Sequence, residues 1–440
     1  MISRMEENLK IGFFVIRSKF EIGAERGELL LSQAREELKK RIDVYVFEEV
    51  VDNKETLEKA IKFFKSKDIC NFCVLLATWS DDSLILDLLS EIKLPVIVWS
   101  IPGIHYGSLC GGQQICCVLK ELGIPYKFIF GNLEDASVYE KILSYSKTIY
   151  LINALSKAKF GLLGHRISGM TEVAYDEIGI KKVFGSRMVL SNNDRINLLK
   201  HDVKDEEILE VYEKLRNTVG RINVEKEDVF NSIKFYLALK KWVTQEQLNG
   251  IAIECYPELM GDVCLAFSLL SEEGIVSACE GDVNSLIATF ILYKLAGQPV
   301  NNTDLLDLNF LENWAIFSHC GSSGFSIAAN KDKISIVPVR LANKGVCCHF
   351  PCKKGDVTLL NLVGGRDSFR SFIIQGQSIE TDMVFPGNPI KVVLPIKIEE
   401  FLQIIEENGF GHHWMIGYGR VANEIEELFK ILKINYVTKG

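Results

Sequence analysis

The chain has 440 residues, too many for one ordinary hydrophobic core, and this length predicts two or three domains. Its 50 basic and 58 acidic residues give a net charge of −8 with no long run of like charge, which argues against a nucleic acid partner. No uncharged apolar run reaches the roughly 18 residues that span a membrane, and the N-terminal segment carries early charge without a cleavage-site pattern. We therefore expect a cytoplasmic protein with no membrane partner.

Residues 1–157 alternate strand-like and helix-like runs. The expected strands are KIGFFVI, DVYVFEEV, NFCVLLATW and PVIVWSI, and the helices between them include NKETLEKAIKFFKSK and DDSLILDLLSEI. This pattern predicts βαβ units and a parallel sheet, in which ligands bind beyond the carboxyl ends of the strands. Four residues near such ends are candidate substrate contacts: Trp79, Ser80, Gln113 and Gln114.

The glycine-rich segment 101–114 opens a helix but does not match a nucleotide site. It lacks the order G-x-x-x-x-G-K-[ST], and no G-x-G-x-x-G follows the first strand. Substrate contact and simple loop packing remain open for this segment, since loops at this edge are the usual ligand surface.

Residues 158–298 predict a second α/β domain. AKFGLLGHRISGM begins as a strand and breaks into a loop at Gly164, and helical patterns cover EVAYDEIGIKKVFG and most of residues 205–247. Then follow the strand GIAIECYPEL, the helix GDVCLAFSLLSEEG, the strand IVSACEG and the helix DVNSLIATFILYKLAG. Glu254 and Glu280 therefore lie near carboxyl ends of parallel strands, and Asp282 is expected to cap the helix after it.

Residues 299–440 change in texture. WAIFSH, KISIVPVR, VCCHF, GDVTLLNLVG, SFIIQGQSI and IKVVLP are short strand-like runs divided by Gly, Asn, Asp and Pro, the pattern of an antiparallel sheet or barrel. The helix IEEFLQIIEENG, the strand HHWMIGYG and the helix VANEIEELFKILKI follow. The predicted fold is thus α/β, with two Rossmann-like parallel-sheet domains and a C-terminal antiparallel β-barrel domain.

The twelve cysteines are scattered through apolar segments, as free core thiols of a reducing compartment are. Cys70 and Cys73 have C-x-x-C spacing, but no second pair follows at zinc-finger distance. Cys347, Cys348, His349 and Cys352 crowd together in GVCCHFPC, yet adjacent strand residues point to opposite faces, so an ordinary strand and turn is favoured over a zinc site.

Carboxylates and histidines at the ends of elements form a better metal-ligating set. Oxygen and imidazole donors suit Mn, Co, Fe or Mg better than a thiolate-rich structural zinc site does. The doublet of His412 and His413 is attractive because one ring could bind a cation while the other meets a substrate hydroxyl. The full set is Glu254, Glu280, Asp304, His319, His412 and His413.

Several of these stretches resemble the L-fucose isomerase and L-arabinose isomerase superfamily, in particular the shorter proteins called L-fucose isomerase-like. The matching segments are GLLGHRISGM with YDEIGIKKVFG, then ACEGDVNSLIATFILYKLAGQPVNNTD, WAIFSHCG and HHWMIGYG, in family order over residues 100–420. The resemblance implies a divalent cation, commonly Mn, bound by two carboxylates and a histidine. These fall on Glu280, on Asp304 with Asp307 as the alternative, and on His413 with His412 as the alternate ligand; His319 matches an additional ligand of the arabinose branch.

The resemblance implies an aldose–ketose isomerase that works through a cis-enediol. A divalent cation stabilises the negative charge that develops on the sugar oxygens, and two carboxylates can exchange the roles of general base and general acid. Glu280 and Asp304 are the expected catalytic pair, and the sequence does not assign which removes the proton. The resemblance also implies a homo-oligomer, a dimer, trimer or hexamer, in which the first domain closes over the site of a neighbouring subunit.

The substrate is expected to be a free sugar, and His165 with Arg166 suggests an anionic one. This basic pair departs from the family pattern in GHRISGM and suits a sulfonate, as in sulfoquinovose, although Arg166 could equally fix its own loop. His412 and His319 are further candidate substrate contacts. Two alternatives remain: a non-catalytic cytoplasmic sugar-binding or regulatory protein, and a structural zinc protein organised around CCHFPC.

Overall fold

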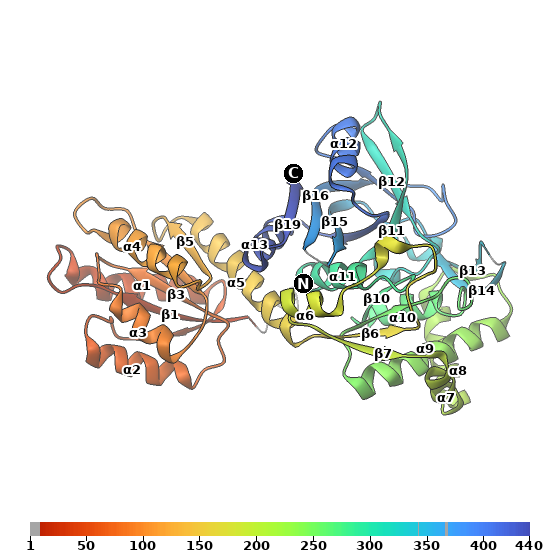
Figure 1. The fold of residues 1–440 in the computed structure, drawn as a ribbon, viewed down its shortest axis with the longest axis horizontal. Coiled ribbons are helices and arrows are strands. Elements are labelled where there is room, and N and C mark those ends of the chain that lie inside the picture. The colour runs from red at the N-terminus through yellow and green to blue at the C-terminus, as the bar shows by residue number, and fades with distance from the viewer. Residues whose placement is uncertain (1–8, 342, 366–367) are drawn as a thin grey trace. The chain divides into compact units, whose positions relative to one another are not determined.

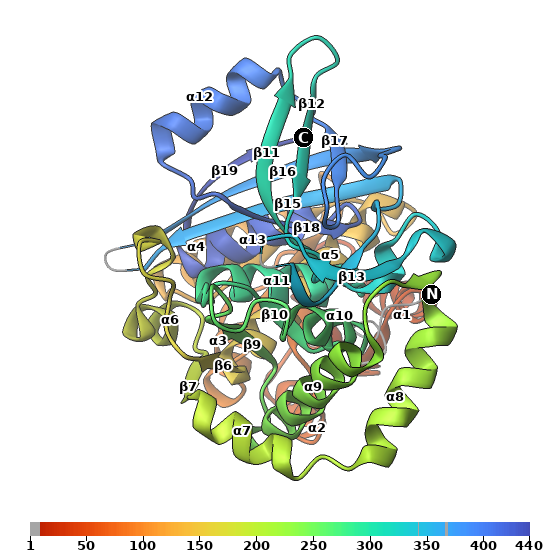
Figure 2. The same cartoon turned by 90° about the vertical axis from the view of Figure 1, so that its right-hand side faces the viewer.

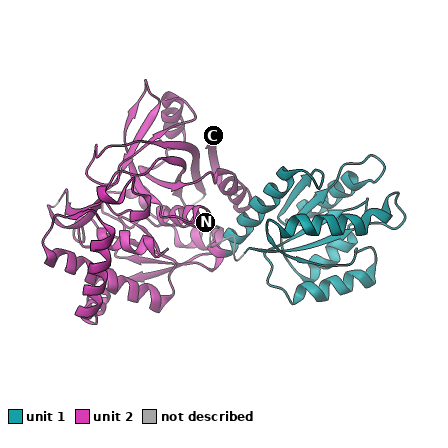
Figure 3. Ribbon diagram, turned by 180° about the vertical axis from the view of Figure 1, so that it is seen from behind, with its two compact units in different colours: residues 1–153 teal, residues 154–440 magenta. Residues whose placement is uncertain are grey.

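The computed structural model describes residues 9–341, 343–365 and 368–440. The chain divides into two compact units, Met1–Asn153 (unit 1) and Ala154–Gly440 (unit 2), each with its own hydrophobic core (Figure 3). The limits at 157 and 298 remain predictions. Within the described ranges, no helix combines the length and the apolar character needed to cross a membrane.

Unit 1 contains a parallel sheet of five strands in the order β2-β1-β3-β4-β5 (Figure 1). The central strand β3 is buried at every position, as in strands covered on both faces. A helix separates each pair of consecutive strands, which confirms the predicted βαβ pattern. The strands are β1 (Lys10–Ile16), β2 (Asp43–Val46), β3 (Asn71–Leu76), β4 (Val96–Ser100) and β5 (Tyr126–Phe130), and the helices are α1 (Gly27–Lys39), α2 (Lys54–Lys65), α3 (Ser83–Glu91), α4 (Ser108–Glu121) and α5 (Ala136–Lys157), whose last four residues fall in unit 2.

Unit 2 begins with a second parallel sheet, in the order β10-β9-β6-β7. Its strands are short and almost entirely buried at the centre of the sheet, where β9 has no exposed position. Both predicted carboxylate-bearing strands, β9 and β10, are present. The strands are β6 (Lys159–Leu163), β7 (Arg187–Ser191), β9 (Gly250–Ile253) and β10 (Val276–Ala278), and the helices of this part are α6 (Glu177–Val183), α7 (Asn193–His201), α8 (Asp205–Thr218), α9 (Lys226–Glu246), α10 (Cys264–Glu272) and α11 (Val283–Ala296).

The rest of unit 2 is mainly strands. Seven form one sheet in the order β15-β18-β11-β12-β17-β16-β19, with β15 also paired to β16. Only β16 and β19 run parallel among these pairs, so the sheet is mixed, and closure into the predicted barrel remains a prediction. A small sheet has the order β14-β13-β8. The elements are β8 (Arg221–Ile222), β11 (Asn301–Asn309), β12 (Trp314–Ser318), β13 (Ser335–Val339), β14 (Lys344–His349), β15 (Gly355–Gly364), β16 (Phe369–Ile379), β17 (Ile390–Val393), β18 (His413–Tyr418), β19 (Asn435–Lys439), α12 (Ile398–Asn408) and α13 (Ala422–Leu432).

Helix α11 lies between the two large sheets of unit 2. It contacts β9 and β10 of the parallel sheet and β15 and β18 of the mixed sheet (Figure 2). Its sequence, VNSLIATFILYKLA, is apolar on every side, and most of its residues are buried, as expected for a helix covered on both faces. The turn at 279–282, which joins β10 to α11, is therefore fixed between two layers.

Several elements escape the sequence pattern, namely the strands β5, β7, β8, β11 and β19 and the helix α7, and β11 is the strand that carries Asp304. The strands β5 and β7 each lie at the edge of a parallel sheet and are only partly covered, so neither forms a continuous apolar run. Helix α7, NDRINLLKH, is mostly polar. Two helix starts also differ from the prediction. The segment 172–185 forms a short 3-10 turn and then α6, which Asp176 caps, and α4 already begins at Ser108.

Candidate active site

Glu280 follows β10 at the carboxyl end of the second parallel sheet, where the sequence predicts a ligand-binding edge. Glu280 and Gly281 both have left-handed backbone angles, with φ of 62° and 69°. Such a conformation costs about 1–3 kcal/mol for a non-glycine residue and persists where the surrounding structure imposes it. A Cβ on Gly281 would lie 2.2 Å from the carbonyl oxygen of His165, so only glycine fits. The tight turn leaves the Glu280 side chain mostly buried, with 13% of its area exposed.

Strand pairing in the mixed sheet brings Asp304 to two histidines distant in sequence. Asp304 on β11 is paired with His413 on β18 and with Ser318 on β12, the residue before His319. Asp304 Oδ1 lies 3.8 Å from Nε2 of His413, and Oδ2 lies 3.8 Å from Nε2 of His319. These distances are too long for direct hydrogen bonds, so the groups surround a common space.

His413 is buried and bound at both ring nitrogens. Nδ1 lies 2.8 Å from Oδ2 of Asp282, and Nε2 lies 3.0 Å from Oε2 of Glu280. Asp282 also accepts a hydrogen bond from the backbone N–H of Ser285 through Oδ1, which confirms its predicted role as helix cap. Because a carboxylate only accepts, Nδ1 of His413 carries a proton toward Asp282, and Nε2 faces Glu280 and Asp304.

His412 lies at the rim of the same group. Its Nδ1 is 2.5 Å from Oε1 of Glu172, and its Nε2 is 3.8 Å from Oε2 of Glu280 and 4.0 Å from Oδ1 of Asp304. The ring packs against that of His413, with centroids 3.9 Å apart. His412 also lines a cavity of about 940 Å³ together with Glu172, Tyr175, Asp176 and Arg370. It therefore joins the buried group to a space large enough for a sugar.

His319, just after β12, closes the group from the other side. Its Nε2 lies 3.8 Å from Oε1 of Glu280, while its Nδ1 lies 3.1 Å from Sγ of Cys320. Five side chains thus converge from four strands of unit 2: Glu280 after β10, Asp304 within β11, His319 after β12, and His412 and His413 at the start of β18.

Contacts between the carboxylates and the histidines shift the pKa values of Glu280 and His413. Burial opposes the charged form of Glu280, but the hydrogen bond from His413 and the nearby rings of His412 and His319 outweigh it and hold the pKa of this carboxyl far below its usual range. Burial also opposes the charged form of His413, yet its bonds to Asp282 and Glu280 raise the pKa to about 9. In the absence of a cation, these rings would therefore compensate the carboxylates as protonated imidazoles.

The donor set fits a divalent cation. Donor atoms of Glu280, His319 and His413, and likewise those of Asp304, His412 and His413, lie within 4.8 Å of one another. Oδ1 of Asp304 is buried without a hydrogen-bond partner among the described residues, although buried acceptors are normally satisfied. Two carboxylates with neutral imidazoles suit Mn, Fe, Co or Mg. The structure contains the predicted donors of a metal site but does not identify the metal.

Two other carboxylates that the sequence offers as candidate ligands, Asp307 and Glu254, have hydrogen-bond partners of their own. Asp307 lies farther along β11, beyond a bulge, and its Oδ1 accepts from the N–H of Leu308. Glu254 accepts a hydrogen bond of 2.7 Å from the backbone N–H of His165. Glu254 therefore fixes the loop that carries the basic pair instead of joining the carboxylate and histidine group.

The loop that carries His165 and Arg166 lies against the turn at residues 279–282, which carries Glu280. The N–H of Ile167 donates to the carbonyl of Glu280, and Arg166 lies against Gly281. His165 is exposed, while Arg166 is partly buried and donates from Nη1 to the carbonyl of Ile167. Both the substrate-binding and the loop-fixing expectation for Arg166 are compatible with this position.

Four candidate substrate contacts belong to unit 1: Trp79 and Ser80 follow β3, and Gln113 and Gln114 lie in α4, the helix after β4. Nε1 of Trp79 donates to Oε1 of Gln114 over 3.0 Å, and the backbone N–H of Trp79 donates to Tyr106. Ser80 is buried. Gln113 and Gln114 belong to α4 instead of the loop before it. Their predicted role above a neighbouring subunit's site remains a prediction.

All twelve cysteines are free, as predicted. Cys70 and Cys73 are buried in unit 1. In the CCHFPC segment, Cys347 contacts His349, whereas Cys352 contacts Asn301 on the other side, so the described residues form no common site there. The predicted strand and turn is confirmed for this segment.

Sequence reasoning missed three contributors to the group. Glu172 lies in a polar segment with no motif, and the second carboxylate oxygen of Asp282 reaches His413 only because α11 and β18 pack together. Cys320 follows His319 directly and offers a thiol, which the surrounding WAIFSHCG does not distinguish from a core residue.

Comparison with known proteins assigns a class: the relatives found are isomerases, so the predicted isomerase is confirmed. Each is named sulfoquinovose isomerase. Those of Priestia aryabhattai and Priestia megaterium are 27% identical over 433 residues, covering 95% of this chain and 96% of theirs. That of Alkalicoccus urumqiensis is 27% identical over 373 residues, covering 82% of this chain and 84% of its own.

Other comparisons add little. No family model matches the chain, so the L-fucose isomerase superfamily remains a resemblance. A solved periplasmic arabinose-binding protein from Shewanella sp. ANA-3 covers 64% of this chain and 85% of its own at 12% identity, with a TM-score of 0.16 that is too low to support an argument.

Proposed function

We propose that this chain is a divalent-metal-dependent aldose–ketose isomerase that acts on sulfoquinovose. The observation that carries the proposal is the convergence of Glu280, Asp304 and His413 at the edge of the parallel sheet, with His319 and His412 beside them. Relatives named sulfoquinovose isomerase that align with 95% of the chain support the substrate. The alternative of a non-catalytic sugar-binding protein has no comparable support.

Glu280, Asp304 and His413 would hold the cation, with His319 as an additional ligand and His412 as the alternate one. The unpaired Oδ1 of Asp304 and the orientation of Nε2 of His413 toward it support this assignment. When bound, a divalent cation stabilises the negative charge that develops on the sugar oxygens. Manganese is our preferred metal, since the donors are oxygen and imidazole nitrogen.

The two carboxylates carry the proton chemistry in this proposal. One takes the proton from C2 of the aldose and the same or the other carboxylate delivers a proton to C1, through a cis-enediol. Glu280 is ionised, because its contacts with the histidines hold its pKa far below the usual range, whereas Asp304 is more exposed and its Oδ1 has no hydrogen bond in the described structure. The assignment of base and acid between them stays open.

The remaining residues bind and orient the sugar. His412 lines the cavity of about 940 Å³ and is fixed by Glu172, so Nε2 can meet a sugar hydroxyl. Beside the turn at Glu280, Arg166 provides positive charge for a sulfonate, and His165 provides a hydrogen-bonding ring. We include in the proposal a cytoplasmic homo-oligomer in which Trp79, Ser80, Gln113 and Gln114 of one subunit cover the site of another.

An aldose panel tests the proposal. The protein is treated with EDTA, reloaded with Mn²⁺ and assayed with sulfoquinovose, glucose, L-fucose and L-arabinose. We expect turnover only after reloading and the highest kcat/KM for sulfoquinovose. Full activity in exhaustively chelated protein contradicts the metal, and equal kcat/KM for the neutral sugars contradicts the sulfonated substrate.

A further inference from the structure

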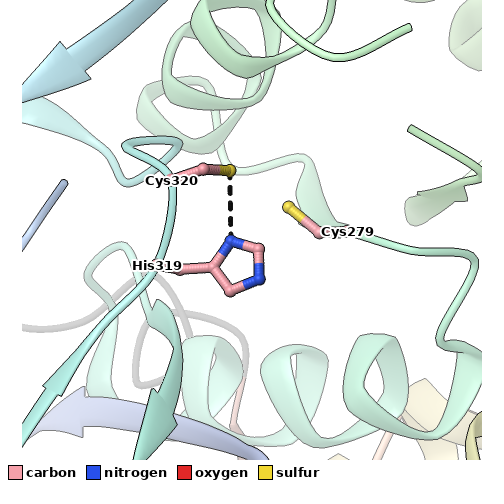
Figure 4. Close-up of side chains that lie close together, drawn as sticks. All are labelled: Cys279, His319 and Cys320. Atoms are coloured by element: carbon pink, nitrogen blue, oxygen red, sulfur yellow. Dashed lines mark hydrogen bonds between the residues drawn. The ribbon is translucent and has the colours of Figure 1, made fainter. Parts of the chain in front are cut away.

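A group of cysteine side chains lies directly behind the candidate active site. Cys279 follows β10, Cys264 begins α10, and Cys320 follows His319 after β12. Figure 4 shows the sulfur atoms of Cys279 and Cys320 turned toward the imidazole ring of His319. We call Cys264, Cys279, Cys320 and Nδ1 of His319 the sulfur cluster.

The spacing of the sulfur cluster matches a tetrahedral metal site. With metal–sulfur bonds of about 2.3 Å, the sulfur atoms of a tetrahedral site lie roughly 3.8 Å apart. Sγ of Cys264 lies 4.0 Å from Sγ of Cys320, which lies 3.1 Å from Nδ1 of His319. Donor atoms of Cys279, His319 and Cys320 all lie within 4.8 Å of one another. Cys279, His319 and Cys320 therefore supply three donors close enough to surround one cation, and Cys264, in contact with Cys320, would supply the fourth.

The surroundings favour a thiolate site over ordinary core packing. Cys264 and Cys279 are each 1% exposed, and they come from segments far apart in sequence. Cys264 is the first residue of α10 and approaches Cys320, which follows β12. The site has three sulfur donors and one nitrogen donor, a set that prefers a d¹⁰ cation to Mn or Mg.

A fourth cysteine marks the limit of the site. Sγ of Cys255 accepts from the backbone N–H of Glu280 over 3.4 Å, so this thiol is engaged by the turn that aims the catalytic carboxylate. The sulfur cluster therefore lies between the Glu280 turn and the start of α10, with His319 on the side that faces the carboxylates.

We propose that Cys264, Cys279, Cys320 and His319 form a second metal site, for a thiophilic d¹⁰ cation such as Zn²⁺. Nδ1 of His319 faces the sulfur atoms and Nε2 faces Glu280 and Asp304. A cation on Nδ1 leaves the ring proton on Nε2, so with the second site filled His319 is a hydrogen-bond donor toward the carboxylates and not a ligand of the first cation. The proposal does not depend on the sugar isomerised, since it rests on the donors of the sulfur cluster alone.

Cadmium is a suitable probe because thiolate–cadmium bonds give a charge-transfer band in the ultraviolet. The exposed Cys110 and Cys117 are replaced by serine in every protein, so that surface thiols add no signal. Reduced, EDTA-treated protein is titrated with Cd²⁺. We expect the band to saturate at about one equivalent per chain. The variant with Cys279→Ser and Cys320→Ser should lose most of it.

Two matched controls separate the second site from the first. Cys352→Ser removes a buried cysteine of the same unit that contacts Asn301 and lies outside the sulfur cluster, and should keep the band. Asp304→Asn weakens the carboxylate site and should also keep it. Absence of the band in the parent protein, or an unchanged band in the double variant, overturns the proposal.

A measurement on the protein with the sulfur cluster intact covers the case in which the double variant does not fold. The ¹¹³Cd NMR shift moves strongly with each sulfur ligand. A resonance in the range of mixed sulfur and nitrogen ligation supports the second site. Resonances only in the range of oxygen and nitrogen ligation overturn it and leave the proposed isomerase untouched, because they report the carboxylate site alone.

Discussion

Oδ2 of Asp282 lies 2.8 Å from Nδ1 of His413, while Oδ1 of the same carboxylate caps α11 through the N–H of Ser285. One residue thus fixes the start of a helix and the orientation of a candidate metal ligand. The pair joins the two layers of unit 2, because Asp282 follows the parallel sheet and His413 begins β18 of the mixed sheet.

Asp282→Asn separates the two roles. Asparagine is as good a helix cap as aspartate, so above about pH 9.5, where His413 is neutral, the free energy of unfolding of the metal-free protein should change by less than about 1 kcal/mol. With its oxygen on Ser285, the amide presents N–H to Nδ1 of His413 and forces the proton onto Nε2, which can then no longer bind a cation. We expect Mn²⁺ affinity, measured by calorimetry, to fall about 10- to 100-fold. Unchanged affinity would show that Asp282 is only a cap.

The metal-free protein should lose stability as pH rises above neutrality. The pKa of His413 is raised from 6.5 to about 9 because, although burial opposes the charge, Asp282 and Glu280 stabilise it. A raised histidine pKa adds stability that is complete below about pH 6.5 and disappears as pH passes 9. In EDTA, the difference in Tm between the protein and His413→Gln should be largest near pH 6 and shrink toward pH 9.5. A difference that grows with pH contradicts the protonated ring.

Gly281→Ala should destabilise unit 2 more than an alanine at another left-handed glycine. Both positions carry backbone strain of about 1–3 kcal/mol for alanine. At Gly281 the added methyl also meets the carbonyl of His165, whereas Gly169, with φ of 93°, has no atom within 4 Å. In urea, Gly281→Ala should lower the free energy of unfolding more than Gly169→Ala does. Equal decreases would show that the loop at His165 moves aside for the added methyl group at little energetic cost.

Arg166→Gln should lower kcat/KM for sulfoquinovose selectively. A charge-assisted contact to a sulfonate is worth about 1.5–3 kcal/mol, so the loss should be roughly 10- to 100-fold, with little change for glucose. Arg187→Gln is a suitable control because this exposed arginine lies on β7, at the sheet edge away from β10. Equal losses for both sugars would assign Arg166 to loop stability.

Local pattern was sufficient for much of the fold and for part of the site. The buried strand β10, the Glu280–Gly281 turn and the Asp282 cap follow from the short segment ACEGDVNSL, since strand, turn and cap signals are all local. Edge strands such as β7 were missed because they are only half covered and lack a continuous apolar run.

Contacts that depend on packing could not be predicted in this way. Glu172 reaches His412, and Cys264 reaches Cys320, only through the packing of elements that are far apart in the chain. No spacing in the sequence encodes these distances. Their positions at the ends of elements make the carboxylates and histidines candidate ligands, the family resemblance assigns their roles, and the structure brings Asp304 and His413 together through strand register.

Solvent exchange tests the proposed isomerisation most directly. The Mn²⁺-loaded protein is incubated with sulfoquinovose in D₂O, and the recovered aldose is analysed by NMR. A general-base mechanism predicts deuterium at C2 of the aldose and at C1 of the ketose, with exchange absent in Glu280→Gln. Binding of the sugar with no deuterium at C2 and no ketose formed would contradict the isomerase and favour a sugar-binding protein.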